Sequence, residues 1–169
     1  MISALRLTGV SVRLADVDVL RGIDLALDAR TVAVVGDNGS GKSTLARVIG
    51  GLVRPTAGTV EVFGLDAVRD AAALRRRTAI VFSNPDAQII MPTVAEDVTF
   101  SLRADRLSRA DRDARVAAAL DRFGLGDLAD RPAYELSGGQ KQLLALCGAF
   151  IREPDLVIAD EPTAFLDGR

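Results

Sequence analysis

Residues 36–43 read Gly-Asp-Asn-Gly-Ser-Gly-Lys-Ser, which fits the pattern G-x-x-x-x-G-K-[ST] without a mismatch. Glycines at these positions allow a tight turn in which consecutive backbone N–H groups point inward at an anion. A helix that begins directly after the turn adds its unpaired N–H groups and the positive end of its dipole. The segment therefore predicts a phosphate-binding loop between a strand and a helix, and with it an α/β fold that binds a nucleoside triphosphate.

The residues around this loop support the interpretation. Residues 31–35 form a short apolar run that predicts a buried parallel strand, and residues 44–49 predict a helix. Lys42 is expected to reach the β- and γ-phosphates as a point charge, and the Ser43 hydroxyl to be a ligand of Mg²⁺. The predicted nucleotide contacts are Gly36, Asp37, Asn38, Gly39, Ser40, Gly41, Lys42, Ser43 and Thr44.

Composition excludes several other classes of protein. The chain has 169 residues, enough for one α/β domain, and its net charge of −2 offers no general basic surface for nucleic acid. Histidine is absent, which excludes His-based acid–base catalysis within these residues. The single cysteine, Cys147, excludes an internal disulfide and is expected to lie in the core. With neither a signal peptide nor an apolar run of about 18 residues, we expect a soluble intracellular chain that does not itself cross a membrane.

Residue patterning divides the chain into three kinds of segment. Antiparallel strands are predicted at 5–8 and 23–27, where apolar and polar residues alternate, and a further short strand at 59–63. Helices are predicted over 66–77, 93–103 and 108–123, and buried strands over 79–82 and 155–160. We expect one domain: an antiparallel β subdomain (1–30 and 56–64), a mostly parallel core (31–55, 65–83 and 153–169) and a helical subdomain (84–152).

Two acids follow the last predicted strand. The strand is expected to place Asp160 beside the Mg²⁺ site, while Glu161 leaves the strand and can address a water at the γ-phosphate. Two adjacent acids at a strand end are common by themselves. Downstream of a phosphate-binding loop they are a specific signal.

Residues 136–140, Leu-Ser-Gly-Gly-Gln, predict a second phosphate-binding element. Ser137 is expected to cap a helix, and the two glycines after it expose backbone N–H groups at the positive end of the helix dipole. Alone, this pattern fits an ordinary capped helix. Together with the loop and the acid pair it indicates a phosphate site.

These segments together resemble the ATP-binding subunit of ABC transporters, and the resemblance covers essentially the whole chain. Residues 36–43 resemble the Walker A motif, residues 156–160 the Walker B motif, and residues 164–167, with Asp167, the D-loop. The resemblance implies Lys42 and Glu161 as catalytic residues, with Ser43 and Asp160 as ligands of Mg²⁺. It implies a head-to-tail dimer with a second ATPase subunit, identical or paralogous, in which each ATP also meets the partner's signature. The signature residues are Ser137, Gly138, Gly139 and Gln140.

Within this family, residues 82–88 are similar to a segment of the energy-coupling-factor importers. Those proteins take up vitamins such as biotin, or cobalt and nickel ions. The similarity implies an integral membrane coupling subunit that docks beside this segment and a separate substrate-binding membrane subunit. It also implies a peripheral position on the cytoplasmic face of a bacterial cell membrane, without nucleic acid as a partner.

The chain departs from the family pattern at several places, of which three bear on its function. Ser83 stands at the Q-loop position in place of glutamine, so either Asn84 or Gln88 substitutes for it or coupling to ATP is looser. Leu14 lies near the usual adenine-stacking aromatic, where Arg13 can stack instead. The sequence stops at residue 169, before the expected core strand with its switch histidine, so we expect a C-terminally truncated ABC ATPase fold with an uncovered strand edge.

Two other functions stay open on this sequence. A non-catalytic nucleotide-binding fragment or regulatory module is favoured by Ser83, Leu14 and the missing histidine. A soluble ABC ATPase of DNA repair or translation is disfavoured by the compact helical insertion, because those proteins usually carry long coiled insertions or a second cassette. Catalysis separates the first alternative from an importer ATPase, and association with a membrane protein separates the second.

Overall fold

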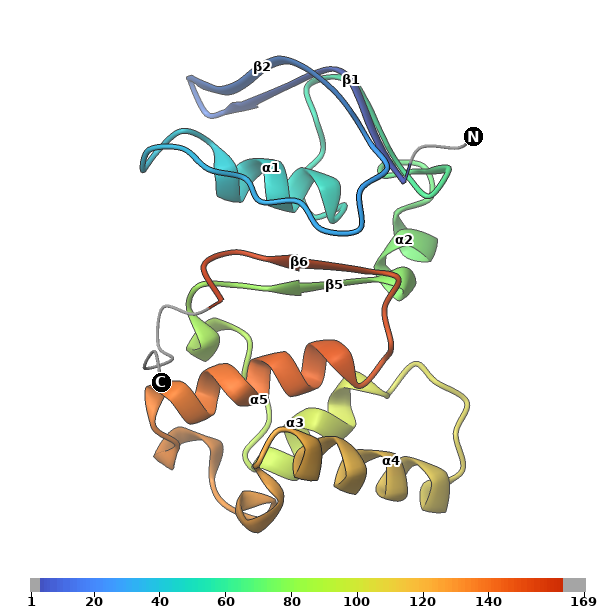
Figure 1. Ribbon diagram of the computed structural model, residues 1–169, viewed down its shortest axis with the longest axis vertical. Helices are drawn as coiled ribbons and strands as arrows, with labels where there is room; N and C mark the ends of the chain where they lie inside the picture. The colour runs from blue at the N-terminus through green and yellow to red at the C-terminus, as the bar shows by residue number, and fades with distance from the viewer. Residues whose placement is uncertain (1–3, 163–169) are drawn as a thin grey trace. The chain divides into compact units, whose positions relative to one another are not determined.

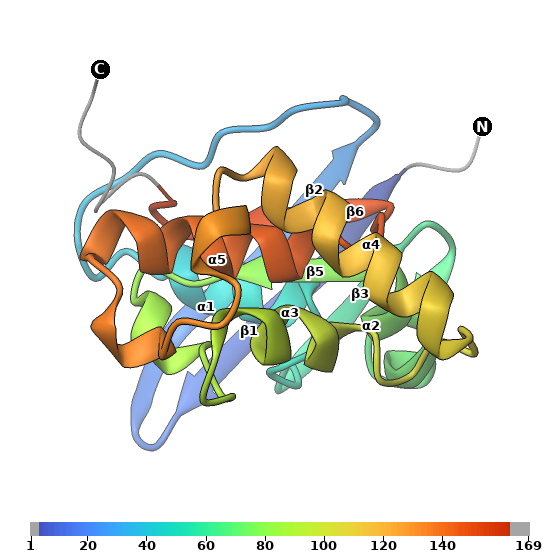
Figure 2. The same cartoon turned by 90° about the horizontal axis from the view of Figure 1, so that it is seen from below.

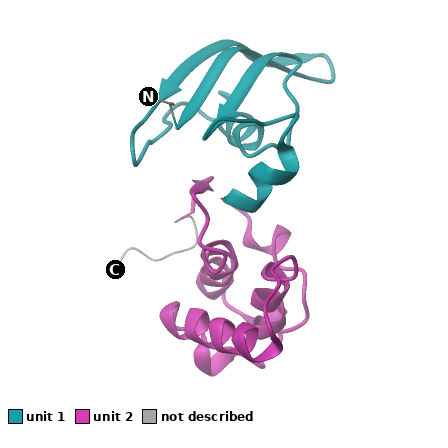
Figure 3. Cartoon of the chain, turned by 90° about the vertical axis from the view of Figure 1, so that its right-hand side faces the viewer, with its two compact units in different colours: residues 1–78 teal, residues 79–169 magenta. Residues whose placement is uncertain are grey.

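The computed structural model describes residues 4–162. The chain divides into two compact units, residues 1–78 and residues 79–169, which Figure 3 shows in different colours. The first unit holds the antiparallel sheet and the phosphate-binding loop (residues 36–43), and the second holds the helical region and the acid pair. The mostly parallel core predicted from the sequence combines residues from both units. The predicted division into a β subdomain, a parallel core and a helical subdomain therefore stays a prediction.

A four-stranded antiparallel sheet in the order β2–β1–β3–β4 is the main element of the first unit, and Figure 1 labels its first two strands, β1 and β2. Its strands are β1 (Leu5–Leu14), β2 (Val17–Leu27), β3 (Ala57–Val62) and β4 (Leu65–Asp66). The predicted antiparallel strands are confirmed, although β1 and β2 are longer than the alternation indicated. Gly9 and Gly22, each with φ of +56°, lie at register shifts between these two strands. Such glycine bulges let both strands continue past the irregularity.

Helix α1 (Lys42–Ile49) begins at Lys42, as the loop pattern predicts. Helix α2 (Ala71–Arg77) is shorter than the predicted 66–77, because Asp66 ends β4 and organises a turn ahead of the helix. Its carboxylate accepts the N–H of Arg69 at 2.7 Å and of Val68 at 2.9 Å. These two bonds hold the pKa of Asp66 below its ordinary value. A carboxylate that caps a turn in this way competes with helix formation.

The predicted buried strand over residues 31–35 is wrong for this structure. Residues 31–37 belong to no strand, and Val32, Val34 and Val35 are 49%, 55% and 91% exposed. A short apolar run becomes a strand only when a neighbouring strand takes up its backbone hydrogen bonds. Neither sheet among the described residues includes this segment. The composition of residues 31–35 favours a strand, but a strand forms only where a neighbouring strand is available to pair with it.

Three helices dominate the second unit: α3 (Val94–Ser101), α4 (Arg109–Arg122) and α5 (Gly138–Phe150). Figure 2 shows α3 lying beside both α4 and α5, and α3 packs against each of them. The predicted starts of α3 and α4 are confirmed. Thr93 and Glu96 form a capping box on α3, and Ser108 Oγ accepts the N–H of Asp111 on α4. Gly124, with φ of +68°, follows the end of α4, where a left-handed glycine commonly terminates a helix.

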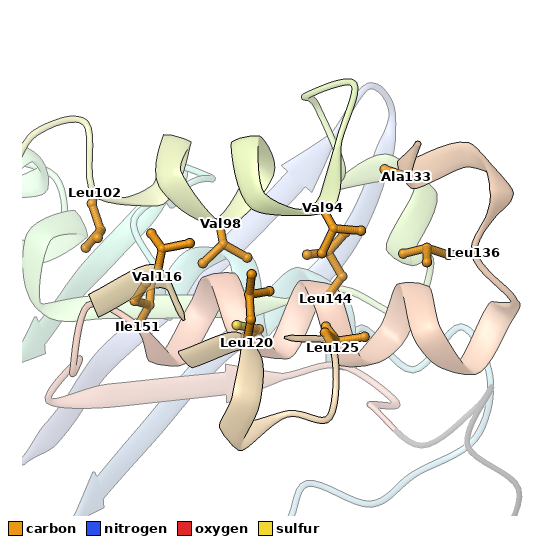
Figure 4. Close-up of a cluster of buried hydrophobic side chains, with 11 residues drawn as sticks. Val94, Val98, Leu102, Val116, Leu120, Leu125, Ala133, Leu136, Leu144 and Ile151 are labelled. Atoms are coloured by element: carbon orange, nitrogen blue, oxygen red, sulfur yellow. The ribbon is translucent and has the colours of Figure 1, made fainter. Parts of the chain in front are cut away.

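The core of the second unit lies between these helices (Figure 4). Its buried members are Val94, Val98, Leu102, Val116, Leu120, Leu125, Ala133, Leu136, Leu144, Cys147 and Ile151. Burial raises the pKa of the Cys147 thiol to about 11, so the thiolate that reacts with electrophiles is scarce at neutral pH. The prediction that Cys147 is a core residue is confirmed.

A two-stranded sheet completes the second unit. Strand β5 (Thr78–Val81) pairs with β6 (Leu156–Ala159), and Figure 1 shows the two running in the same direction. The predicted strands at 79–82 and 155–160 are therefore confirmed. Strand β6 is half-buried, however, and not fully buried as its apolar run predicted. A parallel strand is buried only where other elements cover both faces of its sheet.

One polar side chain of α5 is buried without a partner. Gln142 is fully buried, and neither its Oε1 nor its Nε2 has a hydrogen-bond partner among the described residues. It shares a face of α5 with Ala145 and Ala149, at helical spacing of three and seven residues. Burying an amide without partners costs about 1–3 kcal/mol, so this position lowers the stability of the unit.

We expect Gln142→Met to raise the free energy of unfolding by about 1–3 kcal/mol, because methionine fills a similar volume without polar atoms. Urea unfolding followed by circular dichroism measures the shift of the midpoint. The matched control is Gln140→Met on the same helix, which removes the hydrogen bond from Ser137 N–H to Gln140 Oε1 and lowers stability instead. Unchanged or reduced stability of Gln142→Met would show that a bound water satisfies the amide.

Candidate functional site

The phosphate-binding loop is closed by its own lysine. Lys42 Nζ donates hydrogen bonds to the carbonyl oxygens of Gly36, at 2.7 Å, and Asp37, at 2.8 Å. The ammonium thus lies across the start of the loop and stabilises its curvature. An ammonium has three protons, so one remains to meet an incoming phosphate oxygen. Lys42 therefore shapes the loop as well as supplying its charge, a role the sequence pattern did not indicate.

Strand β2 limits what can stand at the end of the loop. Gly41 has φ of +95°, and a Cβ there would lie 2.9 Å from Leu20 Cδ2 and 3.1 Å from the carbonyl oxygen of Val19. Only glycine fits this left-handed conformation against the strand behind it. Because β2 supports the loop, the N-terminus of α1 is held where its first N–H groups can reach an anion.

The other nucleotide contacts predicted from sequence are only partly positioned by this geometry. Asp37, Asn38, Gly39 and Ser40 are exposed, while Ser43 and Thr44 are half-buried in the first turn of α1. Leu14 is 44% exposed, and Arg13 Nε lies 3.8 Å from Asp18 Oδ1 across the β1–β2 hairpin. Stacking of Arg13 on adenine stays a prediction.

The acid pair directly follows β6, next to a backbone hydrogen bond between the two strands of this sheet. The backbone N–H of Asp160 donates to the carbonyl oxygen of Val81 at 2.9 Å. This bond places Asp160 beside Val81, the last residue of β5. Ser83 follows Val81 by two residues. Parallel strands present their carboxyl ends at one edge of a sheet, which is where α/β proteins bind ligands. Asp160 and the Q-loop position Ser83 therefore both follow the carboxyl ends of paired strands, at the same edge of the two-stranded sheet.

Glu161 has an unusual backbone. Its φ is +51°, in the left-handed region that non-glycine residues seldom adopt, and its side chain is exposed. Such a conformation costs about 1–3 kcal/mol and tends to persist at functional sites. Glu161 lies two residues past the end of β6 and is therefore outside the strand, and its role beside an attacking water stays a prediction.

The predicted cap of the second phosphate-binding element is confirmed. Ser137 is the N-cap of α5, its Oγ accepts the N–H of Gln140 at 3.3 Å, and Gln140 Oε1 accepts the N–H of Ser137 at 2.9 Å. The side-chain oxygen of Gln140 is used in this capping box and is therefore turned toward its own helix rather than toward a ligand. The N–H groups of Gly138 and Gly139 lie in the first turn, where a helix offers no internal acceptor.

Both amides proposed to replace the Q-loop glutamine make local hydrogen bonds in this structure. Asn84 Oδ1 accepts the N–H of Asp86 and caps the 3₁₀ helix η1 (Pro85–Ala87). Gln88 Oε1 accepts the N–H of Phe82 at 2.7 Å, and its Nε2 donates to the carbonyl oxygen of Ile80 at 3.0 Å. The Gln88 amide thus pairs with β5 as a neighbouring strand would. Ser83 itself is half-buried.

A small open hollow of about 200 Å³ lies beside this segment in the second unit. Its lining residues are Asp86, Ile89, Met91, Pro92, Ala133 and Tyr134. The buried carboxylate of Asp97 on α3 fixes one wall by accepting the N–H of Ile90 at 2.7 Å and of Met91 at 3.0 Å. Ile90 and Tyr134 are left 67% and 77% exposed beside it. Sequence reasoning missed Asp97, because an acidic residue in the first turn of a helix is common and gives no sign of the backbone N–H groups that it meets.

The donors predicted for Mg²⁺ have suitable chemistry but lie in different units. Among residues 4–162 no three His, Cys, Asp or Glu side chains gather as a metal site. Mg²⁺ is usually held by one or two protein oxygens together with phosphates of the substrate, and a hydroxyl and a carboxylate are such oxygens. Ser43 and Asp160 each carry an oxygen of this kind, and their joint role as Mg²⁺ ligands stays a prediction. Asp167, predicted as part of the D-loop, lies outside the described residues.

The sequence profile of the family described as ABC transporter matches residues 20–164, which include the phosphate-binding loop, the signature and the acid pair. This chain belongs to the ABC transporter family. No described helix of this ABC chain has the length and apolar character needed to cross a bilayer.

Relatives of this ABC chain carry transport names. It is 45% identical to the biotin transport ATP-binding protein BioM of Rhizobium etli, over 88% of this chain and 66% of the relative. It is 44% identical to the energy-coupling factor transporter ATP-binding protein EcfA1 of Lacticaseibacillus paracasei, over 80% of this chain and 49% of the relative. The chain therefore spans about half to two thirds of the length of these two proteins.

A solved structure shares the fold. The cbiO1 protein of Clostridium perfringens, described as part of the ABC transporter complex cbiONQ, superposes with a TM-score of 0.82 at 35% identity. The match covers 98% of this chain and 68% of cbiO1. The ABC ATPase fold and the resemblance to energy-coupling-factor ATPases, both expected from the motifs, are thereby confirmed.

Proposed function

We propose that this protein is the ATP-binding and ATP-hydrolysing subunit of an ABC importer of the energy-coupling-factor type. Lys42 and the loop amides bind the phosphates, and Ser43 and Asp160 hold Mg²⁺. Glu161 polarises the attacking water, and Ser137 closes the site of a second ATPase subunit in trans. The catalytic part of the proposal rests on Glu161, an exposed carboxylate with φ of +51° that directly follows Asp160 after the end of β6.

The partners follow from the same proposal. The hollow beside η1 is the docking place of an integral membrane coupling subunit, since exposed Ile90 and Tyr134 flank an opening walled by Met91 and Pro92. Exposed apolar residues gathered at a concave surface are typical of protein-binding sites. A separate membrane subunit selects the solute, either a vitamin such as biotin or a transition-metal ion. The protein then works at the cytoplasmic face of a bacterial membrane.

A second candidate is a nucleotide-binding module without hydrolysis. It is favoured by the Q-loop position, where Ser83 is short and the amides of Asn84 and Gln88 are both engaged in local structure. Such a module would bind ATP with the same loop and release it unchanged.

Membrane docking is tested by Ile90→Asp. A charge at this exposed apolar position is expected to reduce co-purification of the protein with an integral membrane partner by about tenfold or more, as at an interface hot spot. The affinity for ATP stays unchanged. Tagged protein is recovered from detergent-solubilised membranes of the native host, and the bound membrane protein is quantified by mass spectrometry.

The matched control is Leu52→Asp, which places the same charge at an apolar residue of the first unit that is 49% exposed. It is expected to co-purify as the unsubstituted protein does. Equal loss in both variants would point to non-specific association, and no membrane partner for the unsubstituted protein would favour a soluble ABC ATPase.

A further inference from the structure

One ion pair joins the segment beside the hollow to the signature helix. Lys141 Nζ lies 2.7 Å from Asp86 Oδ1, which links η1 to α5 across 55 residues of sequence. The lysine side chain is only 18% exposed, whereas the aspartate is 65% exposed. The helix η1 also packs directly against α5. The contact is therefore partly shielded from water, where a charge pair is stronger than at an open surface.

Both ends of this pair are attached to functional positions. Asp86 lines the hollow proposed for the membrane subunit. Lys141 lies one helical turn after the signature cap, and its N–H donates to the carbonyl oxygen of Ser137 at 2.9 Å. The hollow is also lined by Ala133 and Tyr134, in the 3₁₀ helix η3 (Ala133–Glu135) that leads into the signature.

The segment that carries Asp86 is itself held at two further points. The Asn84 side chain fixes the backbone of Asp86, and the Gln88 amide pairs with Ile80 of β5 and with Phe82 just after that strand. A displacement of η1 is therefore not absorbed by a loose loop. A displacement of one element is transmitted to another when packing contacts and hydrogen bonds join the two and leave little freedom for local rearrangement.

We propose that Asp86 and Lys141 are positioning residues that couple the surface of the hollow to the signature helix. A partner that docks in the hollow and displaces η1 shifts Ser137 through this ion pair, and closure of the signature on a nucleotide shifts the docking surface in return. Such coupling is reciprocal by thermodynamic necessity. The inference rests on the proposed function, which assigns the hollow to a membrane subunit and the signature to a nucleotide. The Asp86–Lys141 ion pair itself lies entirely within the second unit.

Charge reversal tests the link in the full-length protein. The variants are Asp86→Lys, Lys141→Asp and the double reversal. Hydrogen exchange is measured for the segments 84–88 and 137–141, and ATP hydrolysis is measured beside ATP affinity. Each single reversal is expected to speed exchange in both segments and to lower hydrolysis by about threefold to fivefold, the range open to one partly shielded ion pair. The double reversal restores both quantities, and ATP affinity does not change.

Exchange that rises only in the substituted segment, or a double reversal as impaired as the single ones, would overturn the coupling. The hydrogen-exchange measurement does not require the protein to hydrolyse ATP. If the unsubstituted protein binds ATP without hydrolysing it, the proposed function fails while the exchange pattern still decides the link. If hydrolysis is normal and the exchange pattern is absent, the link alone fails.

Discussion

Glu161→Gln is expected to lower Mg²⁺-dependent ATP hydrolysis by about two to four orders of magnitude while ATP stays bound. The amide keeps the size and most hydrogen bonds of the carboxylate but cannot take a proton from water. The side chain leaves β6 through a backbone with φ of +51°, which glutamine adopts at a similar cost, so the geometry of the turn is retained. Phosphate release is measured over a range of protein concentrations, with binding followed separately by a fluorescent ATP analogue.

The concentration range adds a second criterion. Because the signature acts in trans in the proposed dimer, turnover of the unsubstituted protein is expected to rise faster than linearly with protein concentration, and this rise disappears in Glu161→Gln. Equal hydrolysis by both proteins would remove Glu161 from the chemistry. Binding without turnover in the unsubstituted protein would instead support the nucleotide-binding module.

Lys42→Ala is expected to weaken ATP binding by about tenfold to a hundredfold, because hydrogen bonds to a charged group each contribute about 1.5–3 kcal/mol. The substitution has a second cost in this structure. It also removes the two bonds from Lys42 Nζ to the carbonyl oxygens of Gly36 and Asp37, so the loop loses its internal brace before any nucleotide arrives. Isothermal titration with ATP and Mg²⁺ measures the affinity.

The natural control is the other lysine of the chain. Lys141→Ala removes a charge from α5 in the second unit and leaves the phosphate-binding loop intact, so its ATP affinity is expected to match that of the unsubstituted protein. Thermal unfolding of both variants separates lost affinity from lost folding. A Lys42→Ala protein that binds ATP normally would contradict the assignment of residues 36–43 as the nucleotide site.

Local features were predictable because they depend on neighbours in sequence. The capping residues Thr93, Ser108 and Ser137 mark helix starts through side-chain bonds that span three residues, and all three were found where expected. The start of α1 follows from the glycine pattern of the loop for the same reason. The family was also readable from sequence, since its motifs are contiguous runs whose chemistry needs those residue types.

Features that depend on distant partners were not predictable in this way. The apolar residues 31–35 have the composition of a strand, yet they form none, because a strand exists only where another strand takes up its hydrogen bonds. Strand β6 is half-buried because its exposure depends on what covers the sheet.

The sequence by itself determined the helix caps, the phosphate-binding loop and the membership in the ABC transporter family, all of which rest on short-range bonding. Only the tertiary structure decided that the Gln88 amide pairs with β5, that Asp97 holds the wall of the hollow, and that Lys141 meets Asp86. Each of these contacts joins groups on different elements, and a side chain finds such a partner only after packing has brought the elements together.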